Sequence, residues 1–197
     1  YLERNAIVGR RLLILKAGSG PSNNLIRSLI AGLPSCFIAG CHEDRFVLKR
    51  SLASRNFLVP PSTQHAFLPA LRRLIESERI DLVIPNSEAQ VKIVSDLRDQ
   101  LSCRVFLPGK PVIELCQDKY ELAMFLRHRG LPVPPTYPIA RLIDIDKVYS
   151  RLPPGVQLWR RIRKGAGSIG ASPVGGAAHA QNRHTAWQEM RATTPGP

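Results

Sequence analysis

Long apolar segments are absent from the sequence, in which no run approaches the roughly 20 apolar residues that a helix needs to cross a bilayer. The first residues, YLERNAIVGRR, lack the basic-then-apolar order of a secretion signal, and they contain no initiating Met. We therefore expect a protein of the cytoplasm with no membrane partner. We also expect residues upstream of Tyr1 to be missing from this chain.

Cysteines are few and are not arranged as metal ligands. No CxxC pair occurs, and no His lies near a cysteine in the spacing that zinc sites use. Because free cysteine is among the most buried residue types, we expect reduced thiols packed in strands and a helix. No metal site is predicted in this chain. The cysteines are Cys36, Cys41, Cys103 and Cys116.

Acidic residues are scarce relative to basic ones. The 197 residues include 15 Asp and Glu against 28 Lys and Arg, which gives a formal net charge of +13 at pH 7. Such an excess favours an anionic partner, namely a phosphate compound, a nucleic acid or a membrane surface. The basic residues are spread over both halves of the chain without a long polybasic tract, so the charge alone does not choose among these partners.

The first hundred residues alternate short apolar segments with amphipathic ones. Strands that alternate with helices indicate βαβ units, so residues 9–109 are predicted to form a parallel sheet of the Rossmann-like α/β class. Ligands of such sheets bind beyond the carboxyl ends of the strands. Strand-like runs lie at 11–17, 35–40, 80–85 and 103–108, and helical periodicity lies at 23–32, 67–78 and 88–101.

The pattern changes after Pro108 and Gly109, and we place a domain boundary near 109–112. Residues 113–130 predict one helix that ends at Gly130, with Asp118 and Lys119 on its exposed face. Its inward residues are predicted to be Leu115, Leu122, Phe125 and Leu126. Further elements are predicted as a short helix at 142–152 and two strands at 156–162 and 171–174.

The segment KAGSGPSNN begins like a dinucleotide-binding fingerprint. Gly18 and Gly20 follow a strand and open a helix, and Glu43 or Asp44 follows the next strand, where an acid could bind a ribose hydroxyl. The third glycine of the fingerprint is absent, because Asn23 stands in its place. A tight turn is the simpler interpretation, although the N-terminus of the helix can still receive a carboxylate or a phosphate.

A second polar segment, IPNSEAQ, follows the predicted strand at 80–85. Asn86 or Ser87 can cap the next helix, and Glu88 suits its first turn. Because this segment lies at the same edge of the predicted sheet as the first glycine loop, a substrate-facing role stays open. The residues of this edge that we predict to face a substrate are Gly18, Ser19, Gly20, Asn24, Ser87 and Glu88.

The stretch RIRKGAGSIGASPV, which begins at Arg161, places three glycines and a serine behind a basic run. Such a loop between two apolar strands can be a plain hairpin turn, or its backbone N–H groups can hold phosphate oxygens. Glycine suits both, because it has no Cβ to keep the backbone away from a ligand. The loop by itself leaves the two alternatives open.

The segment DKYELAMFLRHRGLPVP, which begins at Asp118, resembles the entry of the ATP-grasp ligases, most nearly the branch similar to the carbamoyl phosphate synthase large subunit. In that family a DK-x(n)-G-[ILV]-P-x-P segment leads to a strand bearing a cation and then to a glycine loop of the pattern V-[KR]-P-x-x-G-x-G-S-x-G. Aligned with this pattern, Arg161 takes the cation position, and Ile162 stands where the family has proline.

The resemblance implies three parts of the chain. They are a Rossmann-like pre-ATP-grasp domain at 1–110, the first part of an α+β ATP-grasp lobe at 111–174, and a loose, truncated tail at 175–197. It also implies that ATP is held from two sides while the glycine loop closes over the β and γ phosphates. The ATP-binding residues implied in this way are Lys119, Arg161, Gly165, Ala166, Gly167, Ser168 and Gly170.

The family's later segment carries acidic residues and an asparagine, often as E-x-N, that bind Mg²⁺. After Asp146 the only acidic residue here is Glu189, and no E-x-N follows it. We therefore expect the magnesium ligands of the intact family enzyme to be absent from this chain. A fragment of this kind is predicted to be catalytically inactive.

The resemblance implies that the intact enzyme activates a carboxylate or carbonate as an acyl phosphate with Mg-ATP and transfers the acyl group to an amine-type nucleophile. The partners expected are ATP and a small carboxylate. Two alternatives remain. A basic nucleic-acid-binding module is suggested by the net charge and by the RRIRK run beside Trp159, and a dinucleotide-binding Rossmann protein is suggested by the first glycine loop.

Overall fold

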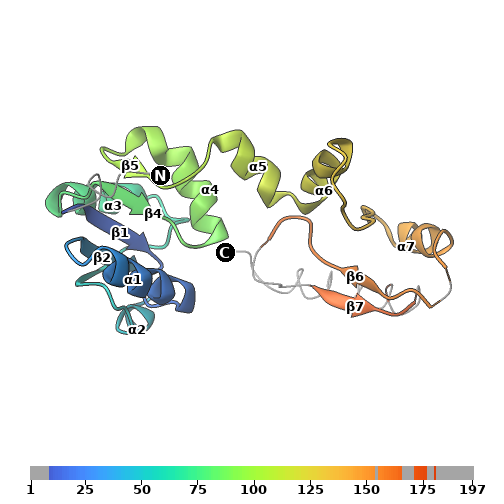
Figure 1. Cartoon of the computed structure of the whole chain (residues 1–197), viewed down its shortest axis with the longest axis horizontal. Helices are drawn as coiled ribbons and strands as arrows, with labels where there is room; N and C mark the ends of the chain where they lie inside the picture. Colours follow the sequence, from blue (N-terminus) through green and yellow to red (C-terminus); the bar gives the residue numbers. More distant parts are fainter. Residues whose placement is uncertain (1–8, 154, 166–170, 177–179, 181–197) are drawn as a thin grey trace. The chain divides into compact units, whose positions relative to one another are not determined.

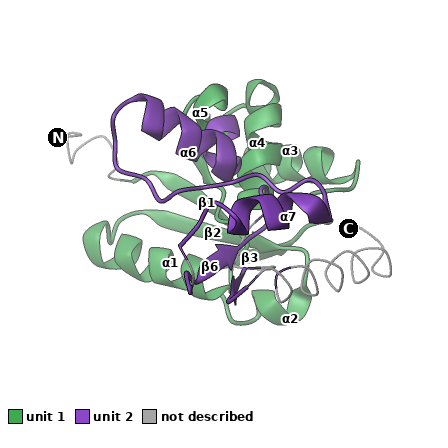
Figure 2. Cartoon of the chain, turned by 90° about the vertical axis from the view of Figure 1, so that its right-hand side faces the viewer, with its two compact units in different colours: residues 1–113 green, residues 114–197 purple. Residues whose placement is uncertain are grey.

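The computed structural model describes residues 9–153, 155–165, 171–176 and 180. It divides the chain into two compact units, residues 1–113 and 114–197, which Figure 2 shows in green and purple. In the described ranges no helix is long and apolar enough to cross a membrane.

Unit 1 is built on a parallel sheet of five described strands in the order β3-β2-β1-β4-β5 (Figure 1). The strands are β1 (Arg11–Leu15), β2 (Phe37–His42), β3 (Arg55–Leu58), β4 (Leu82–Ile84) and β5 (Arg104–Val105). The helices between them are α1 (Gly20–Gly32), α2 (Arg45–Leu48), α3 (Phe67–Ser77) and α4 (Glu88–Leu97), the last continued by a 3-10 turn at Arg98–Gln100. The structure thus confirms the predicted α/β class and the parallel sheet.

Alternate residues of the central strand face two different cores. Leu13 and Leu15 belong to a cluster that includes side chains of α3 and α4, whereas Ile14 packs with Ile26 of α1. Figure 2 shows α1 and α2 on one side of the sheet and α3 and α4 on the other. A strand covered on both faces needs apolar residues on both of them, and the four residues that follow Arg11 in β1 satisfy this requirement.

Two elements of unit 1 escaped the sequence analysis, namely the four-residue helix α2 and the edge strand β3. Strand β3 pairs with β2 on one side only, and three of its four residues are exposed. An edge strand without a continuous buried face has little of the apolar patterning from which strands are predicted. Helix α2 is too short to show helical periodicity.

Unit 2 contains the end of α5 (Lys110–Gln117), then α6 (Lys119–His128) and α7 (Leu142–Tyr149). It also contains β6 (Leu158–Arg160) and β7 (Ser172–Val174), which pair antiparallel. Its described core joins α7 to the strand pair through Ile145 and Val174, against which Leu158 packs. The predicted tail at 175–197 falls, apart from Gly175, Gly176 and Ala180, outside the described residues.

The prediction of one helix at 113–130 is wrong. The chain forms two helices, because Asp118 adopts an extended backbone (φ −101°, ψ 100°) and caps α6. Asp118 is also only 4% exposed, so it does not lie on an exposed helix face. Phe125, expected to point inward, is 40% exposed. The helix does end as predicted, with Gly130 at φ +74° directly beyond it.

The cysteines are free, as expected for reduced thiols. Cys41 is buried in β2, and burial raises the pKa of its thiol to about 12. Cys116, in α5, is exposed, so the expectation that the thiols are packed is wrong for this residue.

The two glycines of the first loop, Gly18 and Gly20, differ in their surroundings, so replacing each by alanine should have different effects on stability. Gly18 has φ +90°, and a Cβ on it would overlap the backbone carbonyl of Val47. Gly20 has nothing within 4 Å of the position of its Cβ. We expect Gly18→Ala to lower the free energy of unfolding of unit 1 by about 2 to 4 kcal/mol. Gly20→Ala should leave it unchanged or raise it by up to about 1 kcal/mol. Urea unfolding followed by circular dichroism measures both, and equal effects would contradict the structure.

Candidate functional site

The predicted substrate edge lies at the carboxyl ends of β1 and β4, where the order of the strands reverses. Ser19 caps α1 by accepting a hydrogen bond from the N–H of Ser22 at 3.4 Å. Ser22 is fully buried and donates its hydroxyl to the carbonyl of Leu15, the last residue of β1, at 3.2 Å. The turn between strand and helix is therefore fixed by its own side chains.

The β4 side of this edge is joined to the β1 side by Asn86, whose amide donates to the Ser22 hydroxyl at 2.8 Å. Ser87 caps α4 by accepting from the N–H of Gln90 at 3.3 Å, and Glu88 occupies the first turn. The loops that begin α1 and α4 are thus bonded to each other. Crevices at such a reversal of strand order are the usual ligand sites of open α/β sheets.

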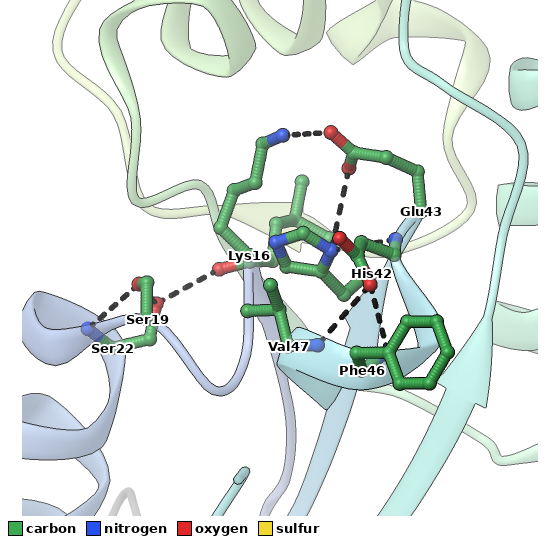
Figure 3. Close-up of polar contacts among 9 residues, drawn as sticks. Lys16, Ser19, Ser22, His42, Glu43, Phe46 and Val47 are labelled. Atoms are coloured by element: carbon green, nitrogen blue, oxygen red, sulfur yellow. Dashed lines mark hydrogen bonds and ion pairs between the residues drawn. The ribbon is translucent and has the colours of Figure 1, made fainter. Parts of the chain in front are cut away.

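A cluster of polar side chains flanks the same edge at the end of β2 (Figure 3). Lys16 and Glu43 form an ion pair. His42, 7% exposed, accepts a hydrogen bond at Nδ1 from the backbone N–H of Asp44 at 2.8 Å. That bond leaves Nδ1 without a proton, which requires the neutral ring to carry its hydrogen on Nε2. Burial, the largest cause, lowers the pKa of His42.

The acids of the predicted dinucleotide fingerprint are engaged within the chain. Asp44 caps α2 by accepting from the N–H groups of Phe46 and Val47, and these bonds lower its pKa. Glu43 is paired with Lys16. Asn23, in place of the third glycine, donates to the carbonyl of Arg50 at 2.9 Å. The side chains that could bind a ribose thus hold local structure.

The second cluster lies in unit 2, where α6 begins. The Asp118 carboxylate accepts hydrogen bonds from the N–H groups of Tyr120 and Glu121, both at 3.2 Å. The guanidinium of Arg163 donates to both oxygens of the same carboxylate at 2.7 and 2.8 Å. Arg163 also donates to Glu121 at 2.8 Å. These bonds to Arg163, the largest cause, lower the pKa of Asp118 to about 2.

The predicted ATP-binding lysine contacts the start of the glycine loop. The backbone N–H of Lys119 donates to the carbonyl of Arg163 at 3.2 Å, and its ammonium donates to the carbonyl of Gly165 at 2.5 Å. Gly165 has φ +147°, and a Cβ there would overlap the side chain of Ile162. The structure therefore brings Lys119 and Gly165 together.

Arg161, the predicted cation of the strand, follows β6 directly and is exposed. Within the described part of the chain it forms no ion pair, in contrast with Arg163 two residues on. The remaining predicted loop residues, Ala166, Gly167, Ser168 and Gly170, lie outside the described residues. Nor do the described ranges contain a group of three or more His, Cys, Asp or Glu side chains able to hold a metal ion.

Sequence reasoning missed the function of Arg163, which was treated as one cation of a run. Asp118 and Arg163 are 45 residues apart, so no local pattern joins them. A signal for the Asp118 cap was present, because Asp is a preferred N-cap and Glu121 stands three positions later. Reading that signal would have divided the predicted helix at the correct residue.

Acid should weaken unit 2 through Asp118. Its pKa is lowered from 3.8 to about 2 on folding, so its stabilising contribution is present above pH 3.8 and is lost as the pH falls toward 2. We expect Asp118→Asn to destabilise unit 2 at pH 6 and to have a smaller effect near pH 2. Both tryptophans, Trp159 and Trp187, lie in residues 114–197, so urea unfolding followed by their fluorescence reports this unit. An effect independent of pH would contradict the ion pair.

Among known proteins, the chain resembles solved structures in fold but matches none in sequence. No protein-family model and no curated protein matches the chain. Among solved structures, N5-carboxyaminoimidazole synthetase from Staphylococcus aureus is similar to this chain, with 16% sequence identity and a TM-score of 0.66. The matched region covers 90% of this chain and 44% of the synthetase chain. That enzyme has also been solved with ADP, at a TM-score of 0.63.

Two further ligases show the same likeness. The biotin carboxylase domain of the Hydrogenobacter thermophilus 2-oxoglutarate carboxylase was solved with MgADP, ADP and bicarbonate. It is 13% identical to this chain with a TM-score of 0.67, and the matched region covers 93% of this chain and 42% of the carboxylase chain. An L-amino acid ligase from Bacillus licheniformis is 16% identical with a TM-score of 0.57 and covers 88% and 41%. This chain thus spans less than half the length of each of the three. These neighbours are ATP-grasp ligases, and the chain has the fold of their N-terminal portion.

Proposed function

We propose that the chain is the ATP-binding N-terminal portion of an ATP-grasp ligase. In this proposal residues 1–110 form the pre-ATP-grasp domain and residues 111–174 begin the nucleotide-binding lobe. The observation that carries the proposal is the contact between the Lys119 ammonium and the Gly165 carbonyl. In a fold shared with ADP-bound ligases, this contact puts a cation beside the first residue of the glycine loop.

The described residues offer a donor set suited to a polyphosphate. Lys119 supplies an ammonium at the start of α6, and Arg161 supplies an exposed guanidinium without an acidic partner among the described residues. Guanidinium and ammonium groups make charge-assisted hydrogen bonds to phosphate oxygens, which are shorter and stronger than bonds between neutral groups. Residues 166–170 would add backbone N–H donors, as the sequence predicts.

The described residues do not provide a magnesium site. The described acids that contact the segment leading into the glycine loop, Asp118 and Glu121, are bound by Arg163. The Mg²⁺ that accompanies ADP in the biotin carboxylase neighbour would need ligands from elsewhere in an intact enzyme. We therefore propose that this chain binds the nucleotide without turning it over.

The substrate class we propose for the intact enzyme is a small carboxylate or bicarbonate, activated as an acyl phosphate for an amine-type nucleophile. Bicarbonate is bound by one structural neighbour. In unit 1 the bonded loops that begin α1 and α4 form the candidate substrate edge. Helix N-termini favour anions, because unpaired N–H groups and the helix dipole both attract negative charge. The proposed substrate-facing residues remain Gly18, Ser19, Gly20, Asn24, Ser87 and Glu88.

Nucleic-acid binding is the second candidate, and one observation favours it. Trp159 is 69% exposed on β6, next to Arg160 and Arg161. Exposed aromatic rings beside arginines can stack with bases while the guanidinium groups bind phosphates. A steep fall of oligonucleotide affinity with salt, and no competition by ATP, would support this candidate over the ligase.

Replacement of Arg161 tests the nucleotide site. If Arg161 binds a phosphate, Arg161→Ala should weaken ATP binding by roughly 1.5 to 3 kcal/mol, the scale of a hydrogen bond to a charged group. The melting temperature should not change, because the side chain is exposed and supports no described contact. Isothermal titration of the full chain with ATP, together with thermal melts, measures both quantities.

Arg151→Ala is the matched control, since Arg151 is an exposed arginine of the same unit outside the proposed site. It should leave ATP affinity unchanged. Equal losses in the two variants would indicate non-specific attraction of ATP to a basic protein. An Arg161 variant with unaltered affinity would remove this residue from the proposed site.

A further inference from the structure

The segment that contains Arg163 contacts the start of α6 at several points, through Asp118 and through Lys119. Arg163 binds both oxygens of Asp118, the residue that precedes Lys119. Its backbone carbonyl accepts from the N–H of Lys119, and the Lys119 ammonium reaches Gly165, two residues beyond Arg163. The start of α6 and the segment 163–165 thus hold each other through side chains and backbone together.

We propose that Arg163 is a positioning residue, which neutralises Asp118 so that the Lys119 ammonium stays directed at the start of the glycine loop. The proposal deepens the proposed function, on which it rests for the assignment of Lys119 as a phosphate contact. The positioning itself involves only residues of this chain, so it can be measured without a nucleotide.

The burial of Asp118 supports this proposal. The residue is 4% exposed, and a buried carboxylate without a cation is strongly unfavourable. If Arg163 did not bind it, the nearest other cations would be attracted to the carboxylate, and Lys119 is its neighbour in the chain. A Lys119 ammonium drawn to Asp118 would leave the Gly165 carbonyl and would no longer present its charge to a phosphate.

Lys164 does not supply the same fixed contact. Its ammonium lies 3.7 Å from Asp118, and its side chain is 73% exposed. An ammonium is a compact, strongly hydrated charge on a flexible stem, whereas a guanidinium is a rigid planar fork of donors. The Nε–H of Arg163 is shared between both oxygens of Asp118. Arg163 is further placed by Glu121 and lies over the Tyr120 ring, 5.4 Å from its centroid.

The first test reads the Lys119 ammonium directly by NMR. The Nζ resonance of Lys119 in the full chain, assigned by its loss in Lys119→Arg, should shift in Arg163→Gln. It should stay unchanged in the control Arg151→Gln. An Nζ resonance that is identical in wild type and Arg163→Gln would overturn the proposal, whatever the protein binds.

The second test measures ATP binding in a double-mutant cycle. Arg163→Gln should weaken ATP binding by roughly tenfold, as expected when one charge-assisted hydrogen bond is lost. Adding Asp118→Asn to this variant should restore part of the affinity. The carboxylate that captures Lys119 is then gone, while Asn still caps α6, because Asn is as good an N-cap as Asp.

The pattern of results separates the two proposals. If Arg163 only stabilises the fold, Asp118→Asn should weaken ATP binding further in the Arg163→Gln background. This outcome would overturn the positioning proposal. Failure of the wild-type chain to bind ATP would overturn the proposed function instead. In that case the NMR comparison still decides whether Arg163 positions Lys119.

Discussion

Strand β1 is buried on both faces, and this constraint governs the arrangement of unit 1. Leu12, Leu13, Ile14 and Leu15 are at most 2% exposed, so helices must cover both sides of the sheet. Parallel pairing of β1 with β2 and β4 then sends the chain out of all three strands at one edge. Polar residues in the connecting loops are collected there, because polar groups cannot be placed in the apolar layers.

Unit 2 depends on a different kind of contact. Its described apolar core is small, with three buried residues in the cluster around Ile145. The start of α6 is instead attached to the segment after β6 by a buried carboxylate and the arginine that binds it. An ion pair on a buried carboxylate adds little net stability compared with apolar packing, but it fixes geometry, because removing the cation leaves an uncompensated buried charge. The cations proposed to bind phosphate are attached to this pair.

The predictability of the fold followed the distribution of apolar residues. LLIL and FIAG are continuous apolar runs, and they were identified as strands because their burial on both faces leaves no polar positions. RNFL was not identified, because its exposed edge position permits polar residues. The division at Asp118 was missed for a related reason: helical periodicity runs across it, and only the capping side chain marks the break.

The candidate sites were predictable only in part, for a physical reason. The motif order of the resembled family pointed to Lys119 and Gly165, which the structure brings together, whereas phosphate binding by Lys119, Arg161 and the glycine loop stays a prediction. The partner of Asp118 was not predictable, because a contact across 45 residues exists only once the chain has folded. The same holds for the bond between Asn86 and Ser22, which connects residues 64 positions apart.

Helix α5 determines where the protein can be dissected. The division between the two units falls after Ile113, in the middle of this helix, and Ile113 is 4% exposed. A cut at that point would leave a single helical turn, which is too short to persist, because fixing the first turn is the unfavourable step of helix formation. The apolar side chain it holds in place would then be exposed. A cut after Gln117, where α5 ends and Asp118 begins to cap α6, would leave both helices whole and would break one bond at the end of α5, from the N–H of Asp118 to the carbonyl of Leu115.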